Sequence, residues 1–533
     1  MTLEIYDTTL REGEQSAGAS FSIEDRIAIC RHLDNLGVDY IEVGWPLSSD
    51  EVFKSFKECI SAVKKAKIVA FGSTSMGKNI IEDRNLNSIV ETGVKYACIV
   101  GKTPLEHVAK QLNITPEENL KRISESIGFL RENNIQVFYD AEHYFDGFKL
   151  DKEYAVKTLI SAAEAGAERL ILCDTNGGVL PDEAEKIIKE TKEAIAGIGI
   201  SPALGVHFHD DCGLALANTL ASLQYVKQVQ GTINGIGERV GNLNFSEFLP
   251  VYIKKLRKNK GINLKILKDV NEEVFRLSGM DIPESRAFVG DTAFAHKGGI
   301  HTDAAVKGIS YEHENPEEFG NKRIILLNTL GGRSCVTAVA NEFGYRLNKK
   351  DKDVKEKISM LFNELALLER KGYRIGAIKA EQFLLIEKYF GNLKSFFEIK
   401  EWSVNTSFVN GKEVSRFKVK YKVNSEIKED ELSINGGPVD AAYKTLVKAL
   451  TKEYPEVGDI KLVDFHVSIA KSRMEESSVR TMITFRNREV FETVGVDTNI
   501  LQSAIEALVK GFRYYLNRIY SNQTDLKTVK NRG

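Results

Sequence analysis

The chain lacks long hydrophobic runs, and none of its apolar stretches approaches the ~18 residues that a membrane-spanning helix needs. Its first residues, MTLEIYDTTL, have no basic start, apolar core or small-residue cleavage site, so no secretory signal is expected. An excess of one charge is also missing. The 73 basic and 75 acidic residues leave a net charge of −2, which gives no electrostatic reason to expect nucleic acid or an anionic membrane as partner. The six cysteines are scattered without Cys-x-x-Cys spacing, which indicates free, mostly buried thiols in a reducing, cytoplasmic setting.

The length of 533 residues suffices for two to four domains of ~100–200 residues, and a hydrophobic fraction of 42% can fill large cores. Three regions differ in pattern. Residues 1–258 alternate short apolar runs with amphipathic helical stretches, residues 259–400 are mostly helical, and residues 401–525 mix half-exposed strand patterns with helices. The sequence therefore predicts an α/β domain, helical linker subdomains and a C-terminal α+β domain, in that order.

The first region repeats a strand–helix unit eight times. The strands are expected at residues 3–9, 38–44, 67–73, 95–101, 135–142, 168–175, 203–210 and 231–237. Strict alternation implies parallel strands joined by crossover helices, and eight units in about 250 residues are typical of the (β/α)8, or TIM, barrel. An open doubly wound sheet is the alternative, but six strands would be more usual there and no G-x-G-x-x-G motif follows the first strand. The barrel is therefore the favoured fold.

Several polar residues are expected at the C-terminal ends of these strands, where β/α barrels place their active sites. His207 and His209 lie two residues apart on the seventh strand, so both imidazoles face one side, as metal ligands would. Glu12 follows the first strand and Asn242 the eighth, and these strands are neighbours in a closed barrel. Such a set suits zinc, manganese, cobalt or magnesium and leaves room for a 2-oxo acid, whose ketone the ion would polarise. Arg11 could then neutralise the developing alkoxide.

The alternative for the two histidines is an ordinary pair bonded to neighbouring groups. For Arg11 and Glu12 the alternative is a loop salt bridge, which would add little stability. The position of all these residues at strand ends favours the metal site.

Three segments together resemble one enzyme family: DTTLREGEQ (7–15), HFHDD (207–211) and GIGERVGN (235–242). They are similar to the 2-isopropylmalate, homocitrate and citramalate synthases, metal-dependent barrel enzymes related to hydroxymethylglutaryl-CoA lyase. HKGGIHTDAAVKGISY (296–311) resembles the linker motif of that family, and NGGPVDAAYKTL (435–446) resembles the start of its C-terminal regulatory domain. The resemblance covers nearly the whole chain.

The resemblance implies a divalent-metal-dependent condensation of acetyl-CoA with a 2-oxo acid, carried out by a homodimer. It implies that Thr175 binds the substrate carboxylate, while Glu42 orients the substrate or supports the site. Glu142, His301 and Tyr311 match residues with acid–base or orienting roles, although His301 could instead be structural, in a glycine-rich turn. The roles of oxyanion stabiliser for Arg11 and metal ligand for Glu12, His207, His209 and Asn242 are the same as those argued above.

The sequence indicates the identity of the 2-oxo acid less clearly than it indicates the type of reaction. The segments EVGWP (42–46), FYDAEHYFDGFK (138–149) and LCDTNGG (172–178) resemble the citramalate-forming branch, which implies pyruvate as acceptor and a place in isoleucine biosynthesis. Trp45, Phe138 and Tyr139 are bulky residues expected near the mouth, although a pocket separates such acceptors by only ~1–3 kcal/mol per methylene. Near the ends of strands three to five there is no arginine and one lysine, Lys102, which disfavours 2-oxoglutarate. A 2-isopropylmalate synthase and then a homocitrate synthase are the alternatives.

By the same resemblance the C-terminal domain would bind a branched-chain amino acid, isoleucine, as feedback inhibitor. A dimerisation domain without effector is the alternative. Three other classes compete with a synthase. A lyase of this superfamily usually stops after the barrel, and a barrel metal hydrolase usually carries His-x-His on its first strand. A non-enzymatic amino-acid sensor would not need a complete ligand set beside Arg11.

Overall fold

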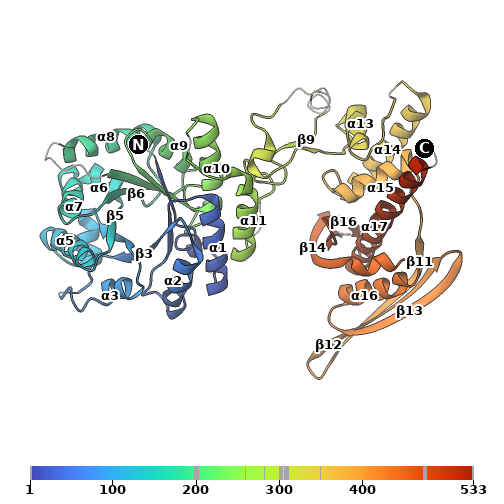
Figure 1. Ribbon diagram of the computed structural model, residues 1–533, viewed down its shortest axis with the longest axis horizontal. Helices are drawn as coiled ribbons and strands as arrows, with labels where there is room; N and C mark the ends of the chain where they lie inside the picture. Colours follow the sequence, from blue (N-terminus) through green and yellow to red (C-terminus); the bar gives the residue numbers. More distant parts are fainter. Residues whose placement is uncertain are drawn as a thin grey trace. The chain divides into compact units, whose positions relative to one another are not determined.

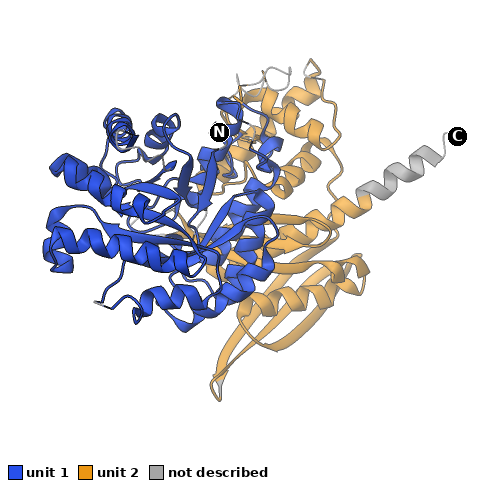
Figure 2. Cartoon of the chain, turned by 60° about the vertical axis from the view of Figure 1, so that its left-hand side comes forward, with its two compact units in different colours: residues 1–294, 314–322 blue, residues 295–313, 323–533 orange. Residues whose placement is uncertain are grey.

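The computed structural model describes the chain except for residues 1–2, 78, 197–202, 259, 281–282, 299–303, 305–310, 349, 472–476 and 531–533 and the side chains of 409, 471 and 521–530. The chain forms two compact units: residues 1–294 with 314–322, and residues 295–313 with 323–533 (Figure 2). The first unit contains a closed parallel barrel, and the second contains a short two-stranded pair and two antiparallel three-stranded sheets.

Eight parallel strands close in sequence order, which confirms the predicted TIM barrel. The strands are β1 (Glu4–Asp7), β2 (Tyr40–Gly44), β3 (Lys67–Ser73), β4 (Tyr96–Lys102), β5 (Gln136–Glu142), β6 (Arg169–Asp174), β7 (Ala203–Phe208) and β8 (Gln228–Gly231). The helices around them are α1 (Ile23–Leu36), α2 (Asp50–Ala62), α3 (Arg84–Glu91), α4 (Leu105–His107), α5 (Pro116–Glu132), α6 (Tyr144–Leu150), α7 (Lys152–Glu164), α8 (Pro181–Ala196), α9 (Ala215–Ser222), α10 (Phe245–Pro250) and α11 (Leu267–Ser278) (Figure 1). Because β1 pairs with both β2 and β8, residues near the start of the chain meet residues that follow the last strand.

The eighth strand begins earlier than expected. It covers Gln228–Gly231 instead of 231–237, and Ile233–Gly235 form a short 3-10 turn in which Asn234 has a φ of 67°. In β8 the buried Val229 alternates with two buried glutamines, Gln228 and Gln230. A strand with polar side chains on one face and few apolar residues gives a weak hydrophobic signal, so the sequence pattern favours the isoleucine-containing loop that follows it.

Aromatic side chains fill the barrel below its mouth. Successive residues of a strand point to opposite faces, so Phe138 enters the barrel interior whereas Tyr139 packs outward against the helices. Tyr139 therefore does not narrow the mouth, and Phe138 lies among the interior tyrosines Tyr6 and Tyr40, with ring centroids 5.9 and 5.1 Å away. Two residues further along their strands, Glu42 and Asp140 are buried above this aromatic layer.

Local sequence sets the limits of α1, the helix beside the first loop of the site. Ser22 and Asp25 form a capping box at its start, and Gly37 ends it with a left-handed φ of 99°. The helix carries Arg26, which is fully buried and donates from Nη1 to the carbonyls of Leu10 (3.2 Å) and Val43 (2.8 Å). Arg26 thereby ties the loop after β1 to the end of β2.

The second unit contains two successive βββα segments. The first comprises β11 (Phe397–Val409), β12 (Lys412–Val423), β13 (Glu426–Asn435) and α16 (Pro438–Thr451), and the second β14 (Lys461–Lys471), β15 (Ser478–Arg486), β16 (Val490–Asp497) and α17 (Ile500–Lys530). Before them come β9 (Ala295–His296), β10 (Ile324–Ile325), α13 (Gly332–Glu342), α14 (Lys352–Lys371) and α15 (Lys379–Phe390). The half-exposed strand patterns predicted within residues 401–525 correspond to strands of both βββα segments, among them β12, β14 and β15.

All six cysteines are free, and every one except Cys212 is buried, as expected from their spacing. None of the described helices combines the length and the apolar character needed to cross a membrane.

Candidate metal centre and barrel mouth

The predicted metal ligands meet at the seam where the barrel closes. Ligand atoms of Glu12, His207 and His209 all lie within 4.8 Å of one another, and the three side chains are buried. Nε2 of His207 is 4.0 Å from Glu12 Oε1 and 2.9 Å from Oδ1 of Asn242. Strand β7 supplies His207, His209 follows it, and the pairing of β1 with β8 brings the other two loops together. The structure thus assembles the four residues that the sequence singled out.

This cluster fits a divalent cation. Glu12 Oε2 and His209 Nδ1 are buried and have no hydrogen-bond partner among the described residues, although buried polar atoms nearly always have one. Burial disfavours the carboxylate form of Glu12, but Arg11 and the two histidines outweigh it and lower its pKa to about 2. Burial and the neighbouring His207 lower the pKa of His209 to about 3, against the opposing effect of Glu12. Near neutral pH both groups therefore have lone pairs available for a metal.

A clamp of buried groups holds Arg11 beside this cluster. Glu42 is fully buried and accepts from Arg11 Nε through Oε1 and from the Tyr6 hydroxyl through Oε2, each at 2.5 Å. Arg11 also forms an ion pair with Glu12, and its guanidinium carbon lies 4.0 Å from the ring centre of Phe71. Burial raises the pKa of Glu42, and Arg11 opposes that shift. Glu42 therefore orients a cationic donor.

Two further predicted residues lie at the ends of β5 and β6. Glu142 forms an ion pair with Lys102, the last residue of β4. Thr175 accepts the backbone N–H of His143 at 2.8 Å, which leaves its hydroxyl hydrogen available to a substrate. Beside them an open pocket is lined by Pro104, Glu106, His107, His143, Asp146, Lys149, Leu150 and Asn176. This part of the mouth offers mixed charge and room for a large substrate.

Of the remaining two predicted residues, Tyr311 belongs to the other unit and has 55% of its surface exposed. His301 lies outside the described residues. Their acid–base roles stay predictions.

The sequence patterns do not predict two polar neighbours of the metal cluster, Gln230 and Asp140. Gln230 Oε1 lies 2.7 Å from Nδ1 of His207, and Gln230 Nε2 donates to Asp140 Oδ1 at 3.2 Å. Gln230 is missed because the eighth strand is predicted at 231–237, whereas it covers Gln228–Gly231. The signal that could have revealed it is the Gln-x-Gln alternation of residues 228–230, which is unusual in a buried strand.

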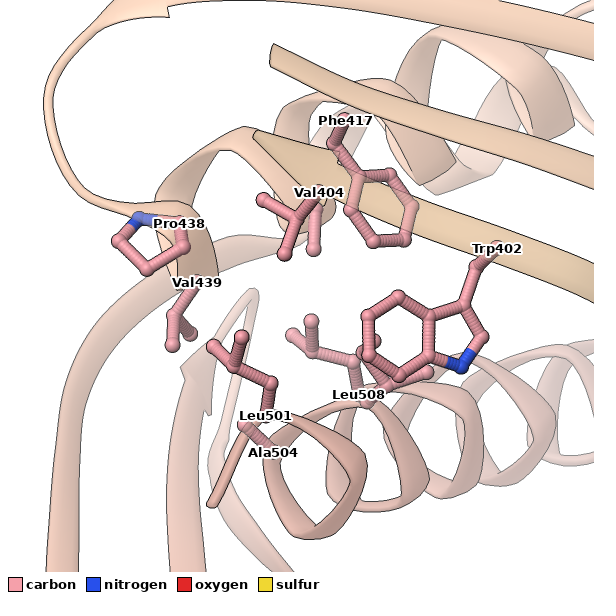
Figure 3. Close-up of a pocket in the computed structure, with 10 residues that line it drawn as sticks. Trp402, Val404, Phe417, Pro438, Val439, Leu501, Ala504 and Leu508 are labelled. Atoms are coloured by element: carbon pink, nitrogen blue, oxygen red, sulfur yellow. The ribbon is translucent and has the colours of Figure 1, made fainter. Parts of the chain in front are cut away.

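A second, narrow pocket lies in the C-terminal βββα segments and is lined by apolar side chains, with a free volume of about 10 Å³, which is room for about one water molecule (Figure 3). Trp402 and Val404 of β11 and Phe417 of β12 lie on one side of it. On the other side are Leu501, Ala504 and Leu508 of α17, with Pro438 and Val439 at the start of α16. The lining offers no charge, and the pocket would have to open to admit an aliphatic group.

Comparisons with known proteins agree with this organisation. Residues 2–274 match the HMGL-like family, residues 288–365 the homocitrate synthase post-HMGL domain-like family, and residues 378–516 the LeuA allosteric (dimerisation) domain. The chain is 38% identical to an (R)-citramalate synthase of Sulfolobus acidocaldarius, over 97% of each chain. It is 37% identical to the (R)-citramalate synthases of Geobacter sulfurreducens, over 97% of this chain and 98% of the relative, and of Aquifex aeolicus, over 96% and 97%.

Proposed function

We propose that this chain, which belongs to the HMGL-like family, is an (R)-citramalate synthase that condenses acetyl-CoA with pyruvate and water to give citramalate and CoA. Such an enzyme is an acyltransferase in which the transferred acyl group becomes an alkyl group. Its product is used in isoleucine biosynthesis. The observation that carries the proposal is the buried Glu12–His207–His209 cluster beside the clamped Arg11, in a chain similar to such synthases over nearly its full length.

Four residues would hold the metal: Glu12, His207, His209 and Asn242. A bound divalent ion supplies Lewis-acid activation of the acceptor ketone. Arg11 lies next to this position and donates to the oxygen that gains negative charge as the new bond forms. Because Glu42 already fixes the guanidinium, little reorganisation is needed in the transition state.

The reaction needs one base and one acid. A base removes a proton from the methyl group of acetyl-CoA, and that carbon forms a bond to the ketone carbon of pyruvate. The alkoxide takes up a proton, and water then cleaves the thioester to release CoA. Glu142, His301 and Tyr311 are the candidates for these proton transfers. Among them, Glu142 is held at the end of β5 by its ion pair with Lys102.

The apolar wall of the mouth suits a small acceptor. Trp45 packs edge-on against Phe71 with ring centroids 6.1 Å apart, and its indole N–H is fixed by Asn85 Oδ1 at 2.8 Å. Arg11 in turn lies over the ring of Phe71, so both aromatic rings are close to the acceptor site. Lys102 is already paired with Glu142, which weakens the case for a dicarboxylic acceptor. These contacts support pyruvate over 2-oxoisovalerate and 2-oxoglutarate.

The C-terminal unit would regulate the barrel. The match to an allosteric domain supports a feedback role. The apolar lining between Trp402 and Leu508 suits the branched side chain of isoleucine only after the narrow pocket opens. The same match supports a homodimer. Strand β14 exposes Val463, Phe465 and Ile469, at 44%, 47% and 67%, and a second copy of this chain would cover such a patch.

The test is the release of free thiol from acetyl-CoA with pyruvate, 2-oxoisovalerate, 2-oxobutyrate or 2-oxoglutarate, with and without a chelator. We expect the highest kcat/KM with pyruvate, loss of activity on chelation and recovery with added metal. Preference for 2-oxoisovalerate would instead make the protein a 2-isopropylmalate synthase. No thiol release with any acceptor, at any metal supplied, would refute the condensing-enzyme proposal.

A further inference from the structure

We propose that Gln230 is a positioning residue that fixes the tautomer and orientation of the metal ligand His207, a role that rests on the proposed metal site. Its amide oxygen lies 2.7 Å from Nδ1 of the imidazole. Gln230 is 1% exposed and His207 3% exposed, so water does not compete for this contact. Buried hydrogen bonds of this kind set which ring nitrogen carries the proton.

Asp140 determines which way round the Gln230 amide must lie. Oδ1 of Asp140 accepts a hydrogen bond from Gln230 Nε2 at 3.2 Å. Burial raises the pKa of Asp140, and this hydrogen bond opposes that shift. The amide NH2 group must therefore face Asp140, which leaves the amide oxygen facing His207. That oxygen can only accept, so His207 Nδ1 must carry a hydrogen. In the neutral ring Nε2 then has the free lone pair.

The lone pair on Nε2 faces the other ligands. Nε2 is 2.9 Å from Asn242 Oδ1, and the Asn242 NH2 group donates to the carbonyl of Ile236 at 3.3 Å, which keeps its oxygen turned toward Nε2. Two acceptors that face each other at this distance repel unless a cation joins them. A spacing of about 3 Å also separates neighbouring ligands on an octahedral ion with bonds of ~2.1 Å. The hydrogen-bonded series Asp140–Gln230–His207 thus orients Nε2 of His207 toward the other ligands before an ion binds.

The second histidine is held differently. Nδ1 of His209 is buried without a hydrogen-bond partner among the described residues, so no comparable amide fixes its ring. We expect His207 to provide the rigid half of the site, with its orientation set by Gln230, and His209 to adjust to the ion.

The same strand offers a matched control. Gln228 lies two residues before Gln230, is fully buried, and donates to Glu4 Oε2 at 3.4 Å, at the N-terminal end of β8. Gln228→Leu and Gln230→Leu therefore remove the same group from the same strand. They differ in whether the lost hydrogen bond reaches a metal ligand.

The experiment measures metal affinity directly on the full-length protein, by competition between the metal-free enzyme and a chromophoric chelator for Mn²⁺ and Co²⁺. Loss of a hydrogen bond to a metal ligand typically weakens metal binding by about 10–100-fold, and we expect this for Gln230→Leu. Gln228→Leu should bind metal within about twofold of the wild type. The absorption bands of the Co²⁺ form should change in Gln230→Leu alone, and excess metal should partly restore its kcat.

A polarity swap completes the test. Gln230→Glu alone places two carboxylates against each other and should weaken metal binding. Combined with Asp140→Asn, the new carboxylate can accept from both His207 and the asparagine, and affinity should return to within about threefold. Wild-type affinity in Gln230→Leu, or equal losses in the two leucine variants, would overturn the role of Gln230. A wild-type protein that binds no metal would overturn the metal site itself.

Discussion

The barrel mouth and the C-terminal pocket differ in the kind of contact that holds their side chains in place. At the barrel mouth, charged and polar groups are buried and each depends on another: Glu42 holds Arg11, and Gln230 holds His207. The C-terminal pocket is lined instead by apolar side chains such as Val404 and Leu508, which have no hydrogen-bonding groups. Removing one polar partner leaves another group unsatisfied, whereas apolar contacts are interchangeable and losses are graded. The contrast predicts steep effects of substitution in the barrel and shallow ones in the C-terminal unit.

The steepest effect is expected at the metal. His209→Ala removes a ligand and the charge stabilisation that depends on it, so kcat/KM should fall by about 10³-fold or more. The measurement is thiol release together with metal content. His466→Ala, on the exposed face of β14, is the control and should leave both unchanged. Full activity of His209→Ala in metal-free solution would contradict the assignment.

A smaller loss is expected at the clamp. Glu42→Gln removes the anion that orients Arg11, and we expect kcat to fall by about 10²-fold, comparable to the loss of one oxyanion donor. Metal content should stay at the wild-type level, because Glu42 contacts Arg11 and Tyr6 instead of the metal ligands. If metal content and kcat fell by the same factor, Glu42 would be needed to hold the metal as well as Arg11.

In the C-terminal pocket the effect should be limited to regulation. Ala504→Leu adds volume on α17 where the side chain meets the pocket, and such overpacking typically costs ~1–3 kcal/mol. Inhibition by isoleucine should weaken by about tenfold, while kcat changes by less than twofold. Ile500→Leu, on the same helix but 50% exposed, should change neither quantity. A parallel loss of kcat would argue against separate roles for the two pockets.

The smallest effect concerns stability and pH. Burial raises the pKa of Asp7 to about 7, against hydrogen bonds from Thr9 that lower it. Between about pH 4 and pH 7 the folded protein keeps this proton while the unfolded chain releases it, so stability falls as pH rises through that window and levels off above it. Asp7→Asn should flatten this dependence and raise Tm at pH 8 by a few degrees relative to the wild type, as measured by thermal unfolding from pH 5 to pH 8. An unchanged slope would show that Asp7 ionises normally.

Sequence patterns predict the structure best where an apolar strand is followed by polar residues. The barrel, the His-x-His pair and the meeting of Glu12 with Asn242 all follow from strand order and closure. Prediction was wrong where the barrel interior is polar, because β8 buries glutamines and so lacks the usual hydrophobic signal. The outward direction of Tyr139 was also missed, since a short continuous apolar run such as 137–139 does not show which face a residue occupies.

The pairing of β1 with β8 has a consequence for biosynthesis. Domains fold as units during translation, N-terminal first. Glu12 is among the first residues to be synthesised, but its partner Asn242 follows only after more than two hundred further residues. A nascent chain that has not yet produced β8 has no seam at which the ligands can meet. The complete set of four ligands therefore exists only after β8 and the loop that follows it have been synthesised.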